Sequence, residues 1–256
     1  GTITSFLSSL TICWPERIER MNKDSPGSSF SNSRDWRERL SDSREQGTGY
    51  AAPGGEFTKA FFEWVVADPK GNLLKNFFAG QRVVELGAGM MPYGYKLAAA
   101  CGARNFVAVE PFYSDIQKRS IQSCISAEVG LPRIPFKVIG QDMLDYLRDE
   151  PDDLLCVIAC GIEDCILPGP DYRSKVECEI ARVLASDTFF LSSHSDLFPK
   201  DLRALELTYP RPSNPRVFDR LRIHGMSSAF DYHEKVVSKL TAQFGEDGRG
   251  LVRPPS

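Results

Sequence analysis

Short apolar runs alternate with amphipathic segments of helical length between residue 56 and about residue 195. The apolar runs predict strands at residues 82–86, 105–110, 136–139, 154–159 and 188–192, and the segments between them predict helices at residues 93–101, 114–127, 143–148 and 172–185. A further helix is expected from residue 56, where bulky apolar side chains recur at helical spacing. This alternation predicts an α/β fold with a doubly wound, mostly parallel sheet and right-handed crossovers.

The pattern is weaker after Pro199. Residues 202–207 look helical, and the prolines at 210, 212 and 215 indicate a loop. Residues 217–224 and 230–240 are expected to form an antiparallel strand pair, although the second run also fits helical spacing. The domain that carries the pattern is therefore placed at residues 56–246, with a polar tail at residues 247–256.

Residues 1–55 differ in composition from the rest of the chain. Serine, glycine and mixed charges dominate from Asp24 to Gly55. Such a segment buries too little apolar surface to offset the entropy lost on ordering. We expect a flexible N-terminal extension; the alternative is a lid that orders over the functional site, with Tyr50 reaching a ligand.

Charge and cysteine content narrow the range of partners. With a formal net charge of −3, the chain has no global attraction for nucleic acid or anionic membrane, and no apolar run reaches the roughly 18–20 residues that span a bilayer. The 7 cysteines include no C-x-x-C pair, so we expect reduced thiols, no metal site and a cytoplasmic location. A local arginine cluster could meet phosphate or an acidic substrate, but a solvated face is the simpler interpretation; its members are Arg211, Arg216, Arg220 and Arg222.

The end of the first predicted strand carries the clearest chemical signal. Residues 83–89 read Val-Val-Glu-Leu-Gly-Ala-Gly, so Gly87 and Gly89 would form a turn that lets the backbone approach a ligand closely. The second predicted strand ends at Glu110, about 20 residues later. A carboxylate there can accept hydrogen bonds from both hydroxyls of a ribose, so these residues predict a nucleotide-binding βαβ unit.

A dinucleotide site would require a third glycine in the order G-x-G-x-x-G, and this chain has Met91-Pro92-Tyr93 in that region. Glu85, two residues before the first glycine, would repel a pyrophosphate and suit a ligand with an amino group and a sulfonium. The segment resembles the class I S-adenosylmethionine-dependent methyltransferases. The resemblance covers about residues 80–195, and it includes Gly-Gln-Asp-Met-Leu at 140–144, similar to the family's third motif, and the strand and loop start at 154–161.

The resemblance implies S-adenosylmethionine as the cofactor. Glu85 would bind its amino group, Glu110 its ribose and Asp142 its adenine amino group, while Phe112 or Met143 would cover the adenine ring. Each of these residues also has a purely structural interpretation, as a turn glycine, a loop carboxylate or part of the core. The expected cofactor site consists of Glu85, Gly87, Ala88, Gly89, Glu110, Pro111, Phe112, Asp142, Met143 and Cys160.

Methyl transfer depends mainly on proximity and orientation, with a general base only where the acceptor must lose a proton. His194, just past the fifth predicted strand, is the candidate base because imidazole titrates near neutrality. Glu163 and Asp164, after the fourth strand, could act as a base or bind a cationic acceptor, or could be solvated loop carboxylates. That loop lacks the Asn/Asp-Pro-Pro-aromatic motif with which resembling enzymes methylate planar amino nitrogens, so the expected acceptor is a small molecule methylated on oxygen or nitrogen.

Two other functions fit the same pattern. A nicotinamide-dependent oxidoreductase is disfavoured by the missing third glycine and by Glu85. A non-catalytic, methyltransferase-like binding or scaffold domain is also compatible, because function depends on sites rather than on folds. The sequence specifies neither the acceptor nor the oligomeric state.

Overall fold

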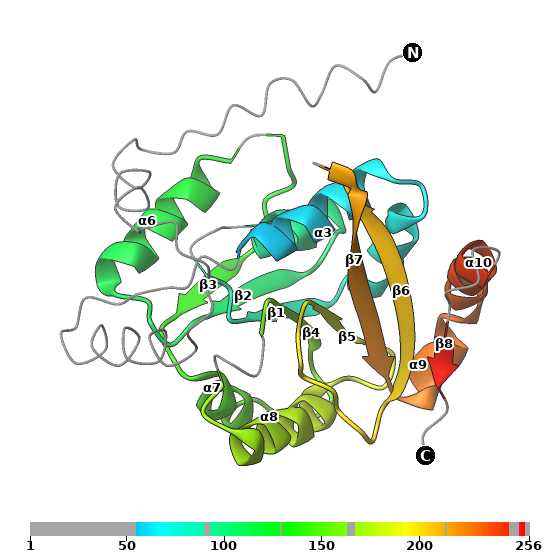
Figure 1. The fold of residues 1–256 in the computed structure, drawn as a ribbon. Helices are drawn as coiled ribbons and strands as arrows, with labels where there is room; N and C mark the ends of the chain where they lie inside the picture. Colours follow the sequence, from blue (N-terminus) through cyan, green and yellow to red (C-terminus); the bar gives the residue numbers. More distant parts are fainter. Residues whose placement is uncertain are drawn as a thin grey trace.

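The computed structural model describes residues 55–89, 93–128, 130–162, 167–212, 214–245 and 251–253. They form an eight-stranded sheet in the order β3-β2-β1-β4-β5-β7-β6-β8 (Figure 1). Strands β1 to β5 run parallel to one another, and β7 pairs antiparallel with both β5 and β6, which confirms the expected doubly wound, mostly parallel α/β sheet. The strands are β1 Arg82–Leu86, β2 Asn105–Val109, β3 Phe136–Ile139, β4 Cys156–Cys160, β5 Phe190–Ser193, β6 Arg203–Arg211, β7 Asn214–Gly225 and β8 Leu251–Arg253.

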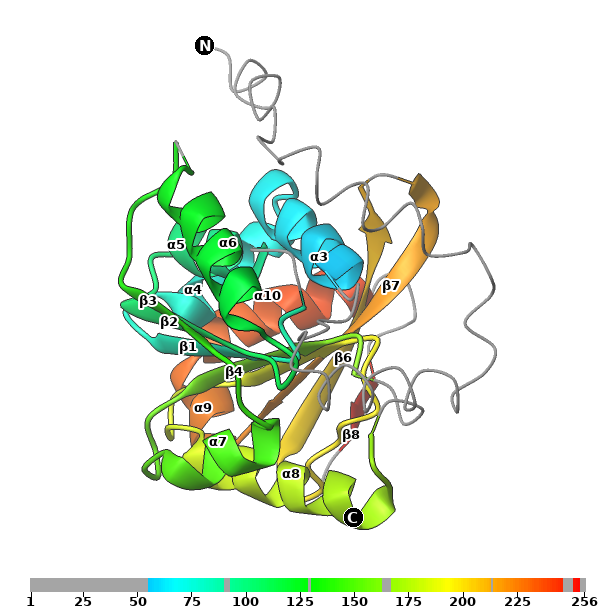
Figure 2. The ribbon, with the colours of Figure 1, turned by 90° about the vertical axis from the view of Figure 1, so that its left-hand side faces the viewer.

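Helices cover both faces of the sheet (Figures 1 and 2). Helices α3, α5 and α6 lie on one face, and α7 and α8 lie on the other. The helices are α3 Gly55–Ala67, the 3-10 helix η1 Gly71–Leu74, α4 Lys75–Phe78, α5 Tyr93–Ala100, α6 Asp115–Ser126, α7 Met143–Asp149, α8 Pro170–Val183, α9 Ser227–Tyr232 and α10 Glu234–Gly245. The N-terminal extension expected at residues 1–55 lies outside the described residues, apart from Gly55 at the start of α3.

Local sequence sets where several helices begin. Ser114 precedes α6 and accepts a hydrogen bond from the backbone N–H of Gln117, whose side chain accepts one from the backbone of Ser114 in return. This reciprocal pair satisfies two donors that a helix start leaves free. Pro170 occupies the first turn of α8, where its missing N–H removes no helical hydrogen bond.

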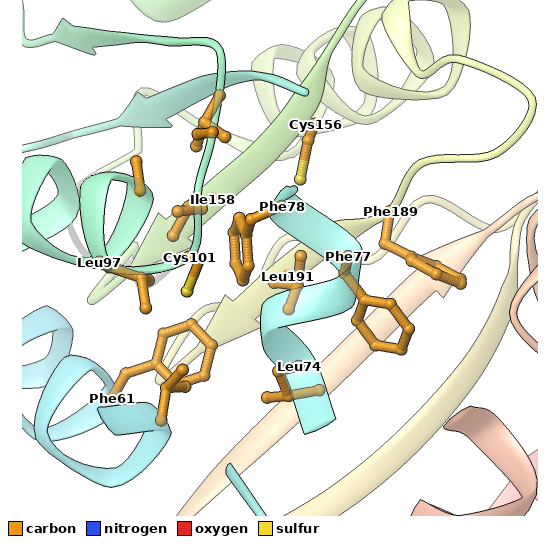
Figure 3. Close-up of a cluster of buried hydrophobic side chains, with 14 of the residues drawn as sticks. Phe61, Leu74, Phe77, Phe78, Leu97, Cys101, Cys156, Ile158, Phe189 and Leu191 are labelled. Carbon is orange, nitrogen blue, oxygen red and sulfur yellow. The ribbon is translucent and has the colours of Figure 1, made fainter. Parts of the chain in front are cut away.

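The larger apolar cluster lies between the sheet and helices α3, α4 and α5 (Figure 3). Phe61 of α3 and Phe78 of α4 share it with Ile158 of β4 and Leu191 of β5, and all four side chains are fully buried. Burying one such side chain contributes about 1.5–3 kcal/mol. A second cluster joins alternate residues of the same strands to α7 and α8. The central strands are therefore apolar on both faces, as buried parallel strands usually are.

The C-terminal third differs from the sequence-based expectation. The helix expected at residues 202–207 is wrong, because residues 203–207 belong to β6. Leu205, Leu207 and Tyr209 are buried at every second position, which is the period of a strand. The strand expected at residues 217–224 is confirmed within β7, but its partners are β5 and β6. Residues 230–240 contribute to α9 and α10 instead.

The hairpin of β6 and β7 extends through the prolines that indicated a loop. Pro210 lies near the end of β6 and Pro215 near the start of β7. Leu251–Arg253, inside the segment expected as a polar tail, pairs with β6 as β8. Among the described residues, no helix has the length and apolar character needed to cross a membrane.

Candidate functional site

The order of the strands reverses beside β1. β2 and β3 continue the sheet on one side of β1, and β4 and β5 continue it on the other. The helices that follow β1 and β2 cover one face, and those that follow β3 and β4 cover the opposite face (Figure 2). The carboxyl ends of β1 and β4 are thus the switch point at which ligands bind in open α/β sheets.

The turn after β1 requires glycine. Gly87 and Gly89 have φ angles of 64° and 61°, in the left-handed region that side chains with a Cβ rarely adopt. A Cβ on Gly87 would also lie 2.3 Å from Cδ1 of Ile162, which follows β4. The turn therefore combines a left-handed backbone with close packing against the neighbouring loop.

Residues that follow β2 hold this turn in place. Gly89 donates its backbone N–H to Oε2 of Glu110 at 3.4 Å, and the hydroxyl of Tyr113 donates to the carbonyl of Gly89. Glu110 is buried, and this burial raises the pKa of its carboxyl to about 7, although hydrogen bonds from the backbone of Gly89 and Phe112 oppose the rise. The structure thus brings Glu110 to the glycine turn. It also brings Tyr113 there, a residue that the sequence marked only by its position three residues after Glu110.

Glu85 lies buried beneath α3. Its Oε1 accepts a hydrogen bond from the hydroxyl of Thr58 at 2.8 Å. Its Oε2 lies 1.8 Å from the place where a Cβ on Gly94 would stand, so only glycine fits at that point of α5. Burial raises the pKa of Glu85 to about 8; the hydrogen bond from Thr58 opposes this, and the charge of Glu110 adds to it.

Asp142 lies between β3 and α7, where it stabilises the start of α7. Its Oδ1 accepts hydrogen bonds from the backbone N–H groups of Leu144 and Asp145, which makes it the N-cap of α7. The hydroxyl of Tyr172, on α8, lies 2.9 Å from Oδ1 and 2.8 Å from Oδ2. A role in adenine recognition stays a prediction, since both carboxylate oxygens already have partners.

The remaining expected cofactor residues lie around the same edge. Ala88 is buried in the glycine turn, and its backbone N–H donates to Val109 at the end of β2. Met143 is buried at the start of α7, and Cys160 is buried at the end of β4, where burial raises the pKa of its thiol to about 12. Pro111 and Phe112 are half-buried after β2. Glu163, Asp164, Met91 and Pro92 lie outside the described residues.

His194 follows β5 and meets side chains from two other elements. Its ring stacks on Phe57 of α3, with 4.1 Å between the centroids, and its Nε2 lies 2.6 Å from Oδ1 of Asp219 on β7. Asp219 is fully buried, and Arg211 on β6 donates to both of its oxygens at 2.9 and 3.0 Å. Burial raises the pKa of Asp219, but the hydrogen bonds from Arg211 and His194 outweigh it and keep the pKa below its usual value.

This arrangement presents an imidazole oriented by an ionised carboxylate. Because Nε2 faces Asp219, the other ring nitrogen, Nδ1, is the one that can accept a proton from a ligand. Sequence reasoning selected His194 but missed Asp219, and it treated Arg211 only as part of a basic cluster. A signal was present: Asp219 has the same strand parity as the core residues Leu221 and Ile223.

Comparison with known proteins finds similarity in structure and none in sequence. No family model matches the chain, and no curated protein matches it. The solved complex of the Haloferax volcanii Trm112 methyltransferase activator with the putative methyltransferase gives a TM-score of 0.47 at 13% identity, covering 74% of this chain and 96% of that chain. A Burkholderia thailandensis 1,6-didemethyltoxoflavin-N1-methyltransferase gives 0.46 at 12% identity, covering 78% and 92%.

A third solved structure is the magnesium protoporphyrin IX methyltransferase of Synechocystis PCC 6803, with a TM-score of 0.44 at 16% identity, covering 77% of this chain and 99% of that chain. At these identities the likeness concerns the fold alone. All three of these solved structures are named for methyltransferases.

Proposed function

We propose that this protein is an S-adenosylmethionine-dependent methyltransferase that acts on a small molecule through an oxygen or nitrogen acceptor. One observation carries the proposal: the left-handed turn at Gly87 and Gly89 ends β1 at the switch point of the sheet, and Glu110 at the end of β2 contacts that turn. This juxtaposition places a left-handed backbone turn and a ribose acceptor at one point of the sheet edge.

The charges of the site suit a cationic nucleoside. Burial raises the pKa values of Glu85 and Glu110, and the charge of Glu110 raises that of Glu85 further. A ligand with positive amino and sulfonium groups would favour the ionised carboxylates, whereas a pyrophosphate would be repelled. The two carboxylates therefore fit S-adenosylmethionine better than a dinucleotide.

When bound, the cofactor would supply the methyl group. Glu85 would hold its amino group and Glu110 its ribose, and the glycine turn would let both approach the backbone. His194 at the end of β5 would accept the proton of the acceptor at Nδ1, and Asp219 and Arg211 would keep its ring oriented. The chain's own contribution is thus orientation together with one proton transfer.

A non-catalytic binding domain is the second candidate, and the packing of Glu85 favours it. Glu85 is 2% exposed, with one oxygen bonded to Thr58 and the other packed against α5. A carboxylate committed to these contacts would have to be re-exposed to bind a ligand. Binding and turnover therefore need separate measurements.

Calorimetric titration of the full chain with S-adenosylmethionine and S-adenosylhomocysteine, with NADH as the control, tests the cofactor. We expect micromolar binding of the first two and none of NADH. Glu110→Gln should weaken the binding of S-adenosylmethionine and of S-adenosylhomocysteine by about tenfold or more, because a charged hydrogen-bond acceptor for the ribose is lost. Glu234→Gln, which removes an exposed charge at the start of α10, should change either affinity by less than about twofold.

No binding of either compound by the folded chain would contradict the cofactor assignment. Equal affinities in Glu110→Gln and Glu234→Gln would contradict the assignment of the site. Tight binding without methyl transfer to a broad panel of alcohols, phenols and amines would favour the non-catalytic domain.

A further inference from the structure

A concave site borders His194 on the face of the sheet that β5, β7 and β6 share. It is a pocket of about 420 Å³, lined by His194 and by side chains from all three strands. The connection from β5 to β6, residues 194–202, contains no helix. This connection contributes Ser195 and Asp196 to the lining of the pocket.

Strand register places polar side chains in adjacent rows on this face. Ser192 of β5 lies opposite Arg222 of β7, which lies opposite Glu206 of β6. In the next row, Arg220 lies opposite Thr208. Residues that lie opposite one another across neighbouring strands point to the same face, so these side chains converge without any contribution from loops.

The lining is rich in hydrogen-bond donors. Arg220 and Arg222 share Glu206, with N–O distances of 3.3 and 3.0 Å to its two oxygens. Glu206 therefore faces two guanidinium groups, each of which has five N–H donors, and Asp196 is a second carboxylate in the lining. Arg222 also donates to the backbone carbonyl of Ser195 at 3.2 Å. A ligand rich in acceptors matches this lining better than a ligand rich in donors.

Ser192 adds an independent sign that the pocket is made for a ligand. Its side chain is 2% exposed and lines the pocket, and among the described residues its Oγ has no hydrogen-bond partner. A buried hydroxyl without a partner costs free energy that an acceptor on a ligand would recover.

One wall of the pocket is apolar. Phe218, two residues before Arg220 on the same face of β7, is 57% exposed although it is a large hydrophobic residue. An exposed aromatic side chain next to two arginines suits a ligand that joins an apolar ring to an acidic group.

We infer that this pocket binds the methyl acceptor through an anionic group, a carboxylate or a phosphate held by Arg220, Arg222 and Ser192, with the apolar part of the acceptor against Phe218. The inference rests on the proposed function, because it names the class of acceptor for that site. His194 borders the same pocket at the end of β5, while its ring packs against Phe57 and Asp219 on the α3 side of the sheet. An acceptor anchored by the arginines would therefore extend past the end of β5 to bring its nucleophile to the imidazole. Two members of the arginine cluster, Arg220 and Arg222, are thus assigned a binding role that the sequence pattern alone did not favour.

Titration of the full chain with four small probes tests the inference. The probes are phenyl phosphate, benzoate, uncharged benzyl alcohol and cationic benzylamine, followed by calorimetry or ligand-detected NMR. We expect phenyl phosphate or benzoate to bind at least about fivefold more tightly than benzyl alcohol, and benzylamine to bind most weakly. Which anion binds better distinguishes a phosphate from a carboxylate acceptor.

Variants on β7 locate the binding. Arg220→Gln should weaken anion binding by about tenfold, since it removes charged hydrogen bonds. The side chain of Arg220 is 58% exposed, so the substitution leaves the core packing unchanged. Arg216→Gln is the matched control, because Arg216 lies on the same strand and its side chain does not line the pocket. Phe218→Ala should weaken the binding of phenyl phosphate and leave the affinity for inorganic phosphate unchanged.

Equal binding of benzyl alcohol and phenyl phosphate would overturn the inference, and so would equal losses in Arg220→Gln and Arg216→Gln. Titration with S-adenosylmethionine on the same samples separates the two proposals. Selective anion binding without cofactor binding would sustain the pocket and contradict the methyltransferase. Cofactor binding without anion preference would sustain the methyltransferase and contradict the anion pocket.

Discussion

Two buried carboxylates, Glu85 and Glu110, dominate the chemistry of the switch point. Burial raises their pKa values to about 8 and about 7, from an ordinary value of 4.5. An acid with a raised pKa in the folded state binds its proton more tightly there than in the unfolded chain. The stabilising effect is therefore fully present below about pH 4.5 and is lost as the pH rises through 7 and 8.

We expect Glu85→Gln to flatten the pH dependence of stability. In the wild type, the free energy of unfolding should fall between pH 5 and pH 8, by at most about 1.4 kcal/mol per pH unit for each proton involved. Glutamine keeps an oxygen for the hydroxyl of Thr58 but does not titrate. Urea denaturation at pH 5, 6, 7 and 8 measures the slope, and a variant slope as steep as that of the wild type would contradict the role of Glu85.

The glycine turn between β1 and α5 links a local backbone requirement to the site. Gly87 has a positive φ, and a Cβ there would meet Ile162. Gly102, after α5, also has a positive φ, of 74°, but a Cβ there would meet nothing within 4 Å. The two positions share a left-handed backbone, which would strain any residue with a Cβ, and they differ in what surrounds them.

Gly87→Val should therefore weaken binding of S-adenosylmethionine by about tenfold or more, because it displaces the turn that Glu110 contacts. It should also lower stability by about 1–3 kcal/mol through backbone strain. Gly102→Val is expected to lower stability similarly and to leave cofactor affinity within about twofold of the wild type. Calorimetry and thermal unfolding of both variants give the comparison; equal cofactor affinities would show that the turn is not part of the site.

Long-range packing assembles the surroundings of His194. Phe57 comes from α3, Asp219 from β7 and Arg211 from β6, and the three meet at the end of β5. The ring of His194 is held by stacking on one side and by a hydrogen bond to a buried carboxylate at Nε2. Such an environment fixes the orientation of an imidazole, which is what a general base requires.

We expect His194→Asn to lower kcat by about 10²–10⁴-fold on an acceptor that must lose a proton. Asparagine is the suitable replacement, because His194 has a φ of 48° and asparagine tolerates the left-handed region. The Kd for S-adenosylmethionine should stay within about twofold, since the imidazole acts on the acceptor. Steady-state kinetics and calorimetry measure the two quantities, and an unchanged kcat would remove His194 as the base.

Much of the parallel sheet could be predicted from the chain's pattern of apolar runs. β1 and β3 have the expected bounds, and β2, β4 and β5 lie within two residues of expectation. Buried parallel strands are apolar on both faces and are separated by amphipathic helices, so the signal is local. The Leu202–Leu207 prediction failed because a strand with one polar face also contains leucines at spacings compatible with a helix, and only pairing with β7 decides between them.

The sequence alone specified the glycine turn, the acidic ends of β1 and β2, and the candidate His194, because strand ends and glycine spacing are local features. The tertiary structure decided which groups those residues meet. It buried Glu85 against Thr58, engaged Asp142 with Tyr172, paired His194 with Asp219, and set Ser192 beside Arg222. Each pair joins residues 25 or more positions apart. Contacts over such separations depend on the order of strands in the sheet, which no local pattern encodes.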